Sequence, residues 1–299
     1  MPNVKTVLVT GSSGQLGRCL KAIAERYVDC VFTFVERADL DLSNQQSIHD
    51  YFQQHQFDFI INCAAYTAVD KAESEAELAD QINHLAVQQL AEIALQQQSK
   101  LIHISTDYVF DGKHYQPYKE TDPVAPQAVY GVTKLKGEQA LVATMPTNVV
   151  IIRTSWVYCE YGHNFVKTML RLAADRDQLN VIFDQIGTPT YAGDLAQAIM
   201  TIVGSDHFNQ TSVATEIYHY SNEGVCSWYD FAKAIFALST VQCEVSPIET
   251  KDYPTPATRP HYSLLNKTKI KQAFNIHIPY WRDSLKQCLT QLAQQEQQQ

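Results

Sequence analysis

The sequence predicts an α/β protein: a Rossmann-type doubly wound parallel sheet with a smaller C-terminal α/β region that binds substrate. Short β-branched runs alternate with helical stretches along the chain, which is the order of a parallel sheet joined by crossover helices. The runs are apolar on both faces, as in "FDFIINCAA" from Phe57, so we expect helices on both sides of the sheet. A glycine-rich segment, "VLVTGSSGQLG" from Val7, contains the first of these runs.

Strands are expected over 6–10, 30–36, 57–65, 100–106, 148–154 and 216–222. The apolar spacing of "EAELADQINHLAVQQLAEIALQQQ" predicts a helix over 75–98. After about Ile152 the connections become rich in tyrosine and proline, which is typical of functional loops or a lid region. We therefore expect a dinucleotide-binding domain over 1–155, with later segments around 181–221 returning to it, and a mainly substrate-binding region over 156–299.

Composition limits the classes of partner. The 299 residues carry a formal net charge of −9, which argues against nucleic acid and membrane partners and favours small molecules. The seven cysteines are scattered without a CxxC pair, as in a reduced compartment. No apolar run approaches the length of a membrane span. The sequence thus favours a cytoplasmic protein.

Three glycines, Gly11, Gly14 and Gly17, are spaced three residues apart between the first strand and the first helix. In such a turn, glycine permits positive φ and lets a pyrophosphate approach the N–H groups at the start of the helix. The spacing is GxxGxxG and not the common GxGxxG. On its own it fits a dinucleotide site and a plain strand–helix turn equally well.

The second strand ends in "VERADLDL". Glu36 is a candidate acceptor for the ribose hydroxyls of NADH, and Arg37 a candidate partner for the 2′-phosphate of NADPH. Asp41 stands where a loop could reach the adenine, or belongs to a surface turn. The choice between the two cofactors stays open at this point.

Tyr130 and Lys134 lie four residues apart at the head of a predicted helix, in "VYGVTKLKGE", so their side chains share one face. A tyrosine needs a neighbouring ammonium to act as an acid at neutral pH. Ser105, Thr106 and Asp107, in "STDYVFDG", follow the fourth strand at the sheet edge where such folds bind ligands. Without them, an incidental Tyr/Lys pair on an exposed helix would be the simpler interpretation.

Seven segments together carry a family resemblance: "TGSSGQLG", "NCAAYTAVDKAE", "STDYVFDG", "VYGVTKLKGE", "RTSWVY", "NFVKTMLRLA" and "DQIGTPT". The chain closely resembles the dTDP-4-dehydrorhamnose reductases, which are extended short-chain dehydrogenases/reductases, from its first strand to "RPHYSLLN" at Arg259. The glycine loop and YxxxK mark only the superfamily. "AAYTAVDKAE", "RTSWVY" and "DQIGTPT" are specific to this branch.

The resemblance implies a role for each matching residue. Thr106, Tyr130 and Lys134 would be the catalytic trio, with Asp107 in contact with substrate. The remaining implied residues fall into four groups: Gly14, Gln15 and Leu16 on the pyrophosphate; Asp41 and Leu42 near adenine; Ala64, Ala65 and Tyr66 along the cofactor; Thr67 and Val69 near the nucleotide of the substrate. Trp156 would shape the sugar pocket, although a core aromatic is the alternative. Arg259 is the candidate for the substrate diphosphate, because a guanidinium binds paired oxygens.

The implied activity is an NADPH- or NADH-dependent reduction of the C4 keto group of dTDP-4-dehydro-β-L-rhamnose. Two alternatives stay open. One is a reductase of another nucleotide-linked 4-keto-6-deoxy sugar, and the other is a non-catalytic subunit resembling the regulatory subunits of methionine adenosyltransferase. The latter depart from the family pattern at the positions of Asp107 and Trp156, both of which this chain retains.

One feature departs from the family. Some members are joined in pairs by magnesium bound to glutamates, and two of those positions are Cys19 and Gly193 here, neither of which offers the oxygen ligands that magnesium requires. We therefore expect a monomer, or a dimer that magnesium does not bridge. The histidines show no ligand spacing, so we expect no metal site.

Overall fold

The computed structural model describes residues 4–297. Its centre is a six-stranded sheet in the order β10-β5-β4-β3-β1-β2, in which each pair of neighbouring strands is parallel. The strands are β1 (Lys5–Thr10), β2 (Cys30–Val35), β3 (Phe59–Asn62), β4 (Lys100–Thr106), β5 (Val149–Thr154) and β10 (Glu216–His219). Each lies within a predicted strand except that β1 begins one residue earlier. The predicted fold class is confirmed.

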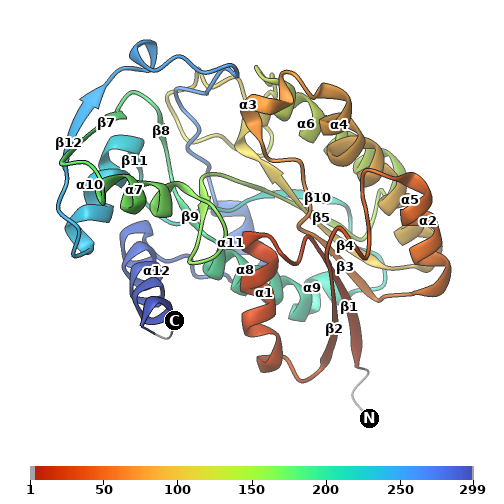
Figure 1. Cartoon of the computed structure of the whole chain (residues 1–299). Helices are drawn as coiled ribbons and strands as arrows, with labels where there is room; N and C mark the ends of the chain where they lie inside the picture. The colour runs from red at the N-terminus through yellow and green to blue at the C-terminus, as the bar shows by residue number, and fades with distance from the viewer. Residues whose placement is uncertain (1–3, 298–299) are drawn as a thin grey trace.

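Helices cover both faces of this sheet (Figure 1). Those of the main unit are α1 (Gln15–Ile23), α2 (Gln45–Gln54), α3 (Val69–Ala72), α4 (Ala76–Asp80), α5 (Ala86–Gln97), α6 (Val129–Thr144), α8 (Ala192–Gly204) and α9 (Asp206–Asn209). Along β1, Val7 and Val9 join a core with α1 and α8, whereas Leu8 joins a second core with α2, α5 and α6. This alternation explains why the three consecutive residues Val7, Leu8 and Val9 are all apolar.

The predicted helix over 75–98 is present but not continuous. Between α4 and α5 the chain forms a π-helical turn, Gln81–Leu85, that buries Asn83. The Asn83 amide accepts a hydrogen bond from the Tyr66 N–H (2.9 Å) and donates one to the Tyr66 carbonyl (3.1 Å). A Cβ on Gly137 would lie 2.2 Å from the Asn83 carbonyl oxygen. At Gly137, α6 therefore packs directly against the backbone of the π-helical turn.

The rest of the chain forms smaller sheets and helices. β6 (Val157–Tyr158) pairs with β9 (Thr190–Tyr191), β7 (Gln178–Ile182) with β12 (Glu244–Ile248), and β8 (Ile186–Gly187) with β11 (Cys226–Ser227). The helices here are α7 (Phe165–Ala173), α10 (Trp228–Leu238), α11 (Thr268–Phe274) and α12 (Trp281–Glu296). In Figure 1, α7, α10 and α12 lie together on the side of the molecule away from α2 and α5. The boundary at 155/156 stays a prediction.

Short 3-10 turns complete the described elements: η1 (Ala24–Arg26), η3 (Asp107–Val109) and η4 (Thr250–Asp252). No helix within residues 4–297 combines the length and the apolar character needed to span a membrane.

Candidate active site

The chain reverses its winding at β1, because β2 lies on one side of it and β3 on the other. A cavity of about 840 Å³ opens at the carboxyl ends of these strands and of β4, where open α/β sheets bind ligands. The predicted site residues on its wall are Gly11, Gly14, Gln15, Leu16, Glu36, Arg37, Asp41, Leu42, Ala64, Ala65, Tyr66, Thr67, Val69, Thr106, Asp107, Tyr130, Lys134 and Trp156. Gly17 and Arg259 are not on this wall.

The glycine loop has a compact backbone that leaves no room for side chains at two of its three glycines. Gly11 has a φ of 65°, and a Cβ there would lie 2.8 Å from the Ala64 nitrogen. Gly14 precedes α1 and no side chain caps this end of the helix, so N–H groups of the first turn are available to a pyrophosphate. A Cβ on Gly17 would lie 2.4 Å from the Gly11 carbonyl oxygen, so Gly17 serves the packing of α1 against the loop.

The loop after β2 forms the other end of the cavity. The exposed Arg37 side chain lies 3.4 Å from the Asp41 carboxylate and donates a hydrogen bond to Ser43 (3.3 Å). The Ser43 hydroxyl donates to Asp41 (2.7 Å), and this bond holds the pKa of that carboxyl below its usual value. Glu36 lies on the same wall. Both cofactor-selecting candidates therefore face the cavity.

The predicted trio meets at the end of β4. Thr106 ends the strand and donates a hydrogen bond to Asp107 (3.0 Å). Burial raises the pKa of Tyr130, and the nearby Thr106 hydroxyl opposes that rise. Burial likewise raises the pKa of Asp107 to about 6. One oxygen of this carboxyl, Oδ2, has no hydrogen-bond partner among the described residues.

A glycine and a distant carboxylate place Tyr130 against β4. A Cβ on Gly131 would lie 2.3 Å from the Tyr108 carbonyl oxygen, so glycine is required for α6 to begin this close to η3. Glu73 accepts a hydrogen bond from the Val129 N–H (2.9 Å) at the start of α6. The branch-specific "AVDKAE" segment thus orients the helix that carries Tyr130.

Lys134 is buried one turn further along α6. Its Nζ donates to the Ile104 carbonyl (2.7 Å) and lies 3.2 Å from Nε2 of His103. Burial lowers the pKa of Lys134 to about 8, although the nearby Glu138 raises it. The ammonium is therefore held at the cavity wall by the end of the strand that also carries Thr106.

Trp156 lies on the cavity wall and is half-buried. Its φ is 48°, and its ring stacks on Trp228 with centroids 3.7 Å apart. A Cβ on Gly187 would lie 3.0 Å from the Trp156 indole. The glycine of "DQIGTPT" thus makes room for the tryptophan of "RTSWVY", which links two of the branch-specific segments.

Arg259 lies at the rim and not on the wall. Its guanidinium forms an ion pair with Asp70 (2.7 Å) and donates to the Tyr108 hydroxyl (3.2 Å). The ring of Tyr108 packs edge-on against Tyr130, with centroids 5.5 Å apart. Sequence reasoning passed over Tyr108, although its place directly after Asp107 on a cavity-facing turn was a usable signal.

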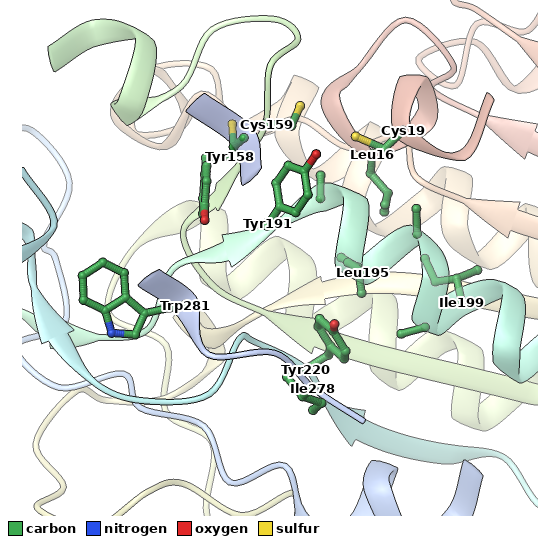
Figure 2. Close-up of a cluster of buried hydrophobic side chains, with 14 of the residues drawn as sticks. Leu16, Cys19, Tyr158, Cys159, Tyr191, Leu195, Ile199, Tyr220, Ile278 and Trp281 are labelled. Carbon is green, nitrogen blue, oxygen red and sulfur yellow. The ribbon is translucent and has the colours of Figure 1, made fainter. Parts of the chain in front are cut away.

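One cluster of potential metal ligands occurs within the part of the chain that the structure describes. Ligand atoms of Cys19, Cys159 and Glu160 lie within 4.8 Å of one another, and all three residues are buried. Tyr191 donates to Glu160 (3.1 Å), and Figure 2 shows its ring beside the two cysteines. This thiol-rich set does not suit magnesium. The expectation that the chain holds no metal stays a prediction.

The model of the RmlD substrate binding domain family matches residues 5–294. The chain belongs to the dTDP-4-dehydrorhamnose reductase family. A curated dTDP-4-dehydrorhamnose reductase from Aggregatibacter actinomycetemcomitans is 46% identical over 289 residues, which is 94% of this chain and 97% of the relative. The resemblance found in the sequence is confirmed.

Solved dTDP-4-dehydrorhamnose reductases share the whole architecture. The crystal structure of the Clostridium acetobutylicum protein matches with a TM-score of 0.89 and 38% identity, over 96% of this chain and 99% of that one. A Bacillus anthracis structure in complex with NADP matches with the same TM-score, 35% identity and the same coverage. Family membership thus covers both the glycine loop and the C-terminal region of this chain.

Proposed function

We propose that the protein is an NAD(P)H-dependent oxidoreductase that reduces the C4 keto group of dTDP-4-dehydro-β-L-rhamnose to give dTDP-L-rhamnose. The observation that carries this proposal is the placement of Thr106, Tyr130 and Lys134 on one wall of a cavity that also contains the glycine loop. Relatives with this printed activity match nearly the full length of the chain. The assignment of each predicted site residue belongs to the same proposal.

The glycine loop and the first turn of α1 bind the pyrophosphate of the dinucleotide through backbone N–H groups. The dinucleotide, when bound, supplies the hydride. Tyr130 donates its phenolic proton to the oxygen of the reduced carbonyl, which becomes the C4 hydroxyl. Such proton donation contributes on the order of 10²–10⁴ in rate.

Thr106 turns its hydroxyl proton from Asp107 to the substrate carbonyl oxygen, beside the Tyr130 phenol. The positive charge of Lys134 stabilises the phenolate that forms when the proton leaves. Asp107 contacts the sugar through its unpartnered oxygen. All three groups are attached to the end of β4 or to the helix packed on it, so their geometry is held by the sheet.

The nucleotide part of the substrate lies along the segment after β3, where Thr67 and Val69 line the cavity. The Arg259 guanidinium binds the substrate diphosphate, and its present partner Asp70 holds it at the rim. Trp156 forms the wall of the sugar pocket. The free thiols of the described cysteines and the acidic net charge fit a cytoplasmic enzyme without nucleic acid partners.

The deciding experiment supplies the purified protein with dTDP-4-dehydro-β-L-rhamnose made enzymatically in the same mixture, and with NADPH or NADH. The loss of reduced-nicotinamide absorbance ranks the two cofactors, and the product is identified by chromatography and NMR. Formation of dTDP-L-rhamnose is expected. Cofactor binding without turnover would overturn the proposal and favour a reductase of another keto sugar or the non-catalytic alternative.

A further inference from the structure

A buried row of polar side chains runs across the sheet beneath Lys134. The strand register pairs Thr10 with Asn62 and Asn62 with His103, so their side chains stand side by side on one face. Thr10 donates to Asn62 Oδ1 (2.7 Å), and Asn62 Nδ2 lies 3.1 Å from His103 Nδ1. His103 Nε2 lies 3.2 Å from Lys134 Nζ. The row therefore links β1, through β3 and β4, to the proposed catalytic lysine.

Packing alone does not explain this row. Two positions earlier on the same face, the register aligns Leu8, Ile60 and Leu101, which are fully buried apolar residues. Thr10, Asn62 and His103 are equally inaccessible, at 2%, 1% and 0% exposed. Buried polar groups stabilise a fold less well than apolar groups of similar size unless their hydrogen bonds are satisfied. A polar row at a core position thus indicates a use for the hydrogen bonds themselves.

The His103 ring is neutral. Burial keeps its pKa well below the ordinary value, and the neighbouring Lys134 lowers it further. A neutral imidazole has one N–H donor and one acceptor nitrogen. When one ring nitrogen changes from acceptor to donor, the other changes in the opposite sense.

Two hydrogen-bond patterns connect Lys134, His103 and Asn62. If Lys134 is an ammonium, Nζ donates to Nε2, and Nδ1–H donates to the oxygen of an Asn62 amide turned by half a rotation. The turned amide then donates to Thr10 in place of the present bond from Thr10 to Asn62. If Lys134 is a free amine, Nε2–H donates to Nζ, and Asn62 Nδ2–H donates to Nδ1. The second pattern holds one proton fewer than the first, and the missing proton is that of the ammonium.

We propose that His103 is a positioning residue for Lys134. His103 holds Nζ in place whether Lys134 is an ammonium or a free amine, because the imidazole changes tautomer when the lysine gains or loses its proton. In the ammonium state, Ile104 O and His103 Nε2 occupy two of the three N–H groups, and the third is directed to the cavity. When Tyr130 has given up its proton, Lys134 supplies one in turn and the row rearranges around the free amine. A proton from solvent then restores the first pattern. This inference rests on the proposed reductase reaction.

Other titratable groups around Lys134 and Tyr130 come from three elements. Glu138, one turn along α6, raises the pKa of Lys134, and it is paired with Arg153 of β5 at 2.6 Å. Asp107 and Tyr108 of η3 both raise the pKa of the neighbouring Tyr130. His103 differs from all of these groups because it contacts Nζ directly without carrying charge.

The first test reads the tautomer and needs no turnover. With ¹⁵N-labelled histidine in the full-length protein, NMR of His103 should show the proton on Nδ1 below about pH 8 and on Nε2 above it. In Lys134→Met this change with pH should be lost. A single tautomer at every pH in the wild-type protein would overturn the proposal, and that result is independent of whether the enzyme reduces the proposed substrate.

The second test uses turnover. His103→Leu should lower kcat on the order of tenfold to a hundredfold, because the Lys134 ammonium is no longer held in position. The alkaline limb of the pH–rate profile should also move to lower pH, because the ammonium loses a hydrogen-bond acceptor. His103→Gln, which keeps an acceptor and a donor, should restore most of the loss. Leu101→Ala, a cavity variant in the apolar row, is the matched control and should keep kcat near the wild-type value while lowering Tm. A His103→Leu enzyme with unchanged kcat and unchanged alkaline limb would refute the role.

Discussion

The Glu138 carboxylate and the Arg153 guanidinium form a two-pronged ion pair between α6 and β5, with Nε–Oε1 at 2.9 Å and Nη2–Oε2 at 2.6 Å. Both side chains are almost inaccessible, at 2% and 3%. Ser105, next to Thr106, also donates to Glu138. The pair therefore ties the helix that carries Tyr130 and Lys134 to the strand that carries Ser105 and to its neighbour β5.

Breaking this ion pair on one side should be costly. Arg153→Met leaves a buried carboxylate without its partner, and we expect a loss of about 3–5 kcal/mol in the free energy of unfolding. The double variant Glu138→Leu/Arg153→Met should recover much of that loss because no charge is left buried. Chemical denaturation of the two single variants and the double variant measures this coupling. Additive losses in the double variant would show that the two groups do not stabilise one another.

Tyr130→Phe should abolish most turnover while keeping the affinity for the dinucleotide, because the glycine loop and the loop after β2 are unchanged. A loss on the order of 10²–10⁴ in kcat is expected for a removed proton donor. Stopped-flow kinetics and cofactor titration by fluorescence give the two quantities separately. A variant that retains most of its kcat would remove Tyr130 from the role of acid.

Asp107 should make the stability of the protein depend on pH. Burial raises its pKa from 3.8 to about 6, so the folded state favours the protonated carboxyl more than the unfolded state does. The protonated Asp107 carboxyl therefore stabilises the fold by about 3 kcal/mol relative to the ionised carboxyl. This stabilisation is complete below the pKa of the unfolded state and is lost as pH rises through about 6. Asp107→Asn lacks this titration. The wild-type protein should therefore lose stability relative to Asp107→Asn between these pH values, as followed by urea unfolding; parallel curves would contradict the shift.

Trp156 adopts a left-handed backbone conformation, with a φ of 48°, which is about 1–2 kcal/mol less favourable for a residue that has a Cβ. Trp156→Gly and Trp156→Ala both remove the stacking on Trp228. The glycine variant should nevertheless be more stable than the alanine variant by about 1 kcal/mol, because glycine adopts this backbone conformation without the cost that a Cβ imposes. Thermal and chemical unfolding of the two variants tests this order. Both should raise the KM for the sugar nucleotide more than the KM for the dinucleotide.

Magnesium should have no effect on the oligomeric state. Cys19 is buried among Leu16, Cys159 and Tyr191 in the core shown in Figure 2. A Cβ on Gly193 would lie 2.6 Å from the Tyr191 ring, so even an introduced glutamate could not be accommodated there without displacing that ring. Gel filtration with EDTA and with added magnesium should give the same elution volume. A magnesium-dependent shift toward a dimer would contradict this prediction.

The sequence was sufficient for the central sheet and for most of the cavity wall. Apolar runs marked each parallel strand. Because the carboxyl ends of such strands meet at one edge, Thr106 and Ala64 could be placed together from the sequence alone. The π-helical turn at Gln81–Leu85 was not predictable, since the apolar spacing on either side of it remains helical. The contact between Arg259 and Asp70 joins segments far apart in the chain and leaves no local signal. His103 was overlooked because a histidine within an apolar strand has no periodicity that distinguishes it from core.

The turn that buries Asn83 has a bearing on how the chain tolerates changes in length. A π-turn accommodates one residue more than an α-turn. Deleting a single residue there would give a regular helix in which α4 and α5 keep their alignment with α6. The amide that fastens the Tyr66 backbone would be lost with it. The irregular turn thus supplies the side chain that secures the loop after β3.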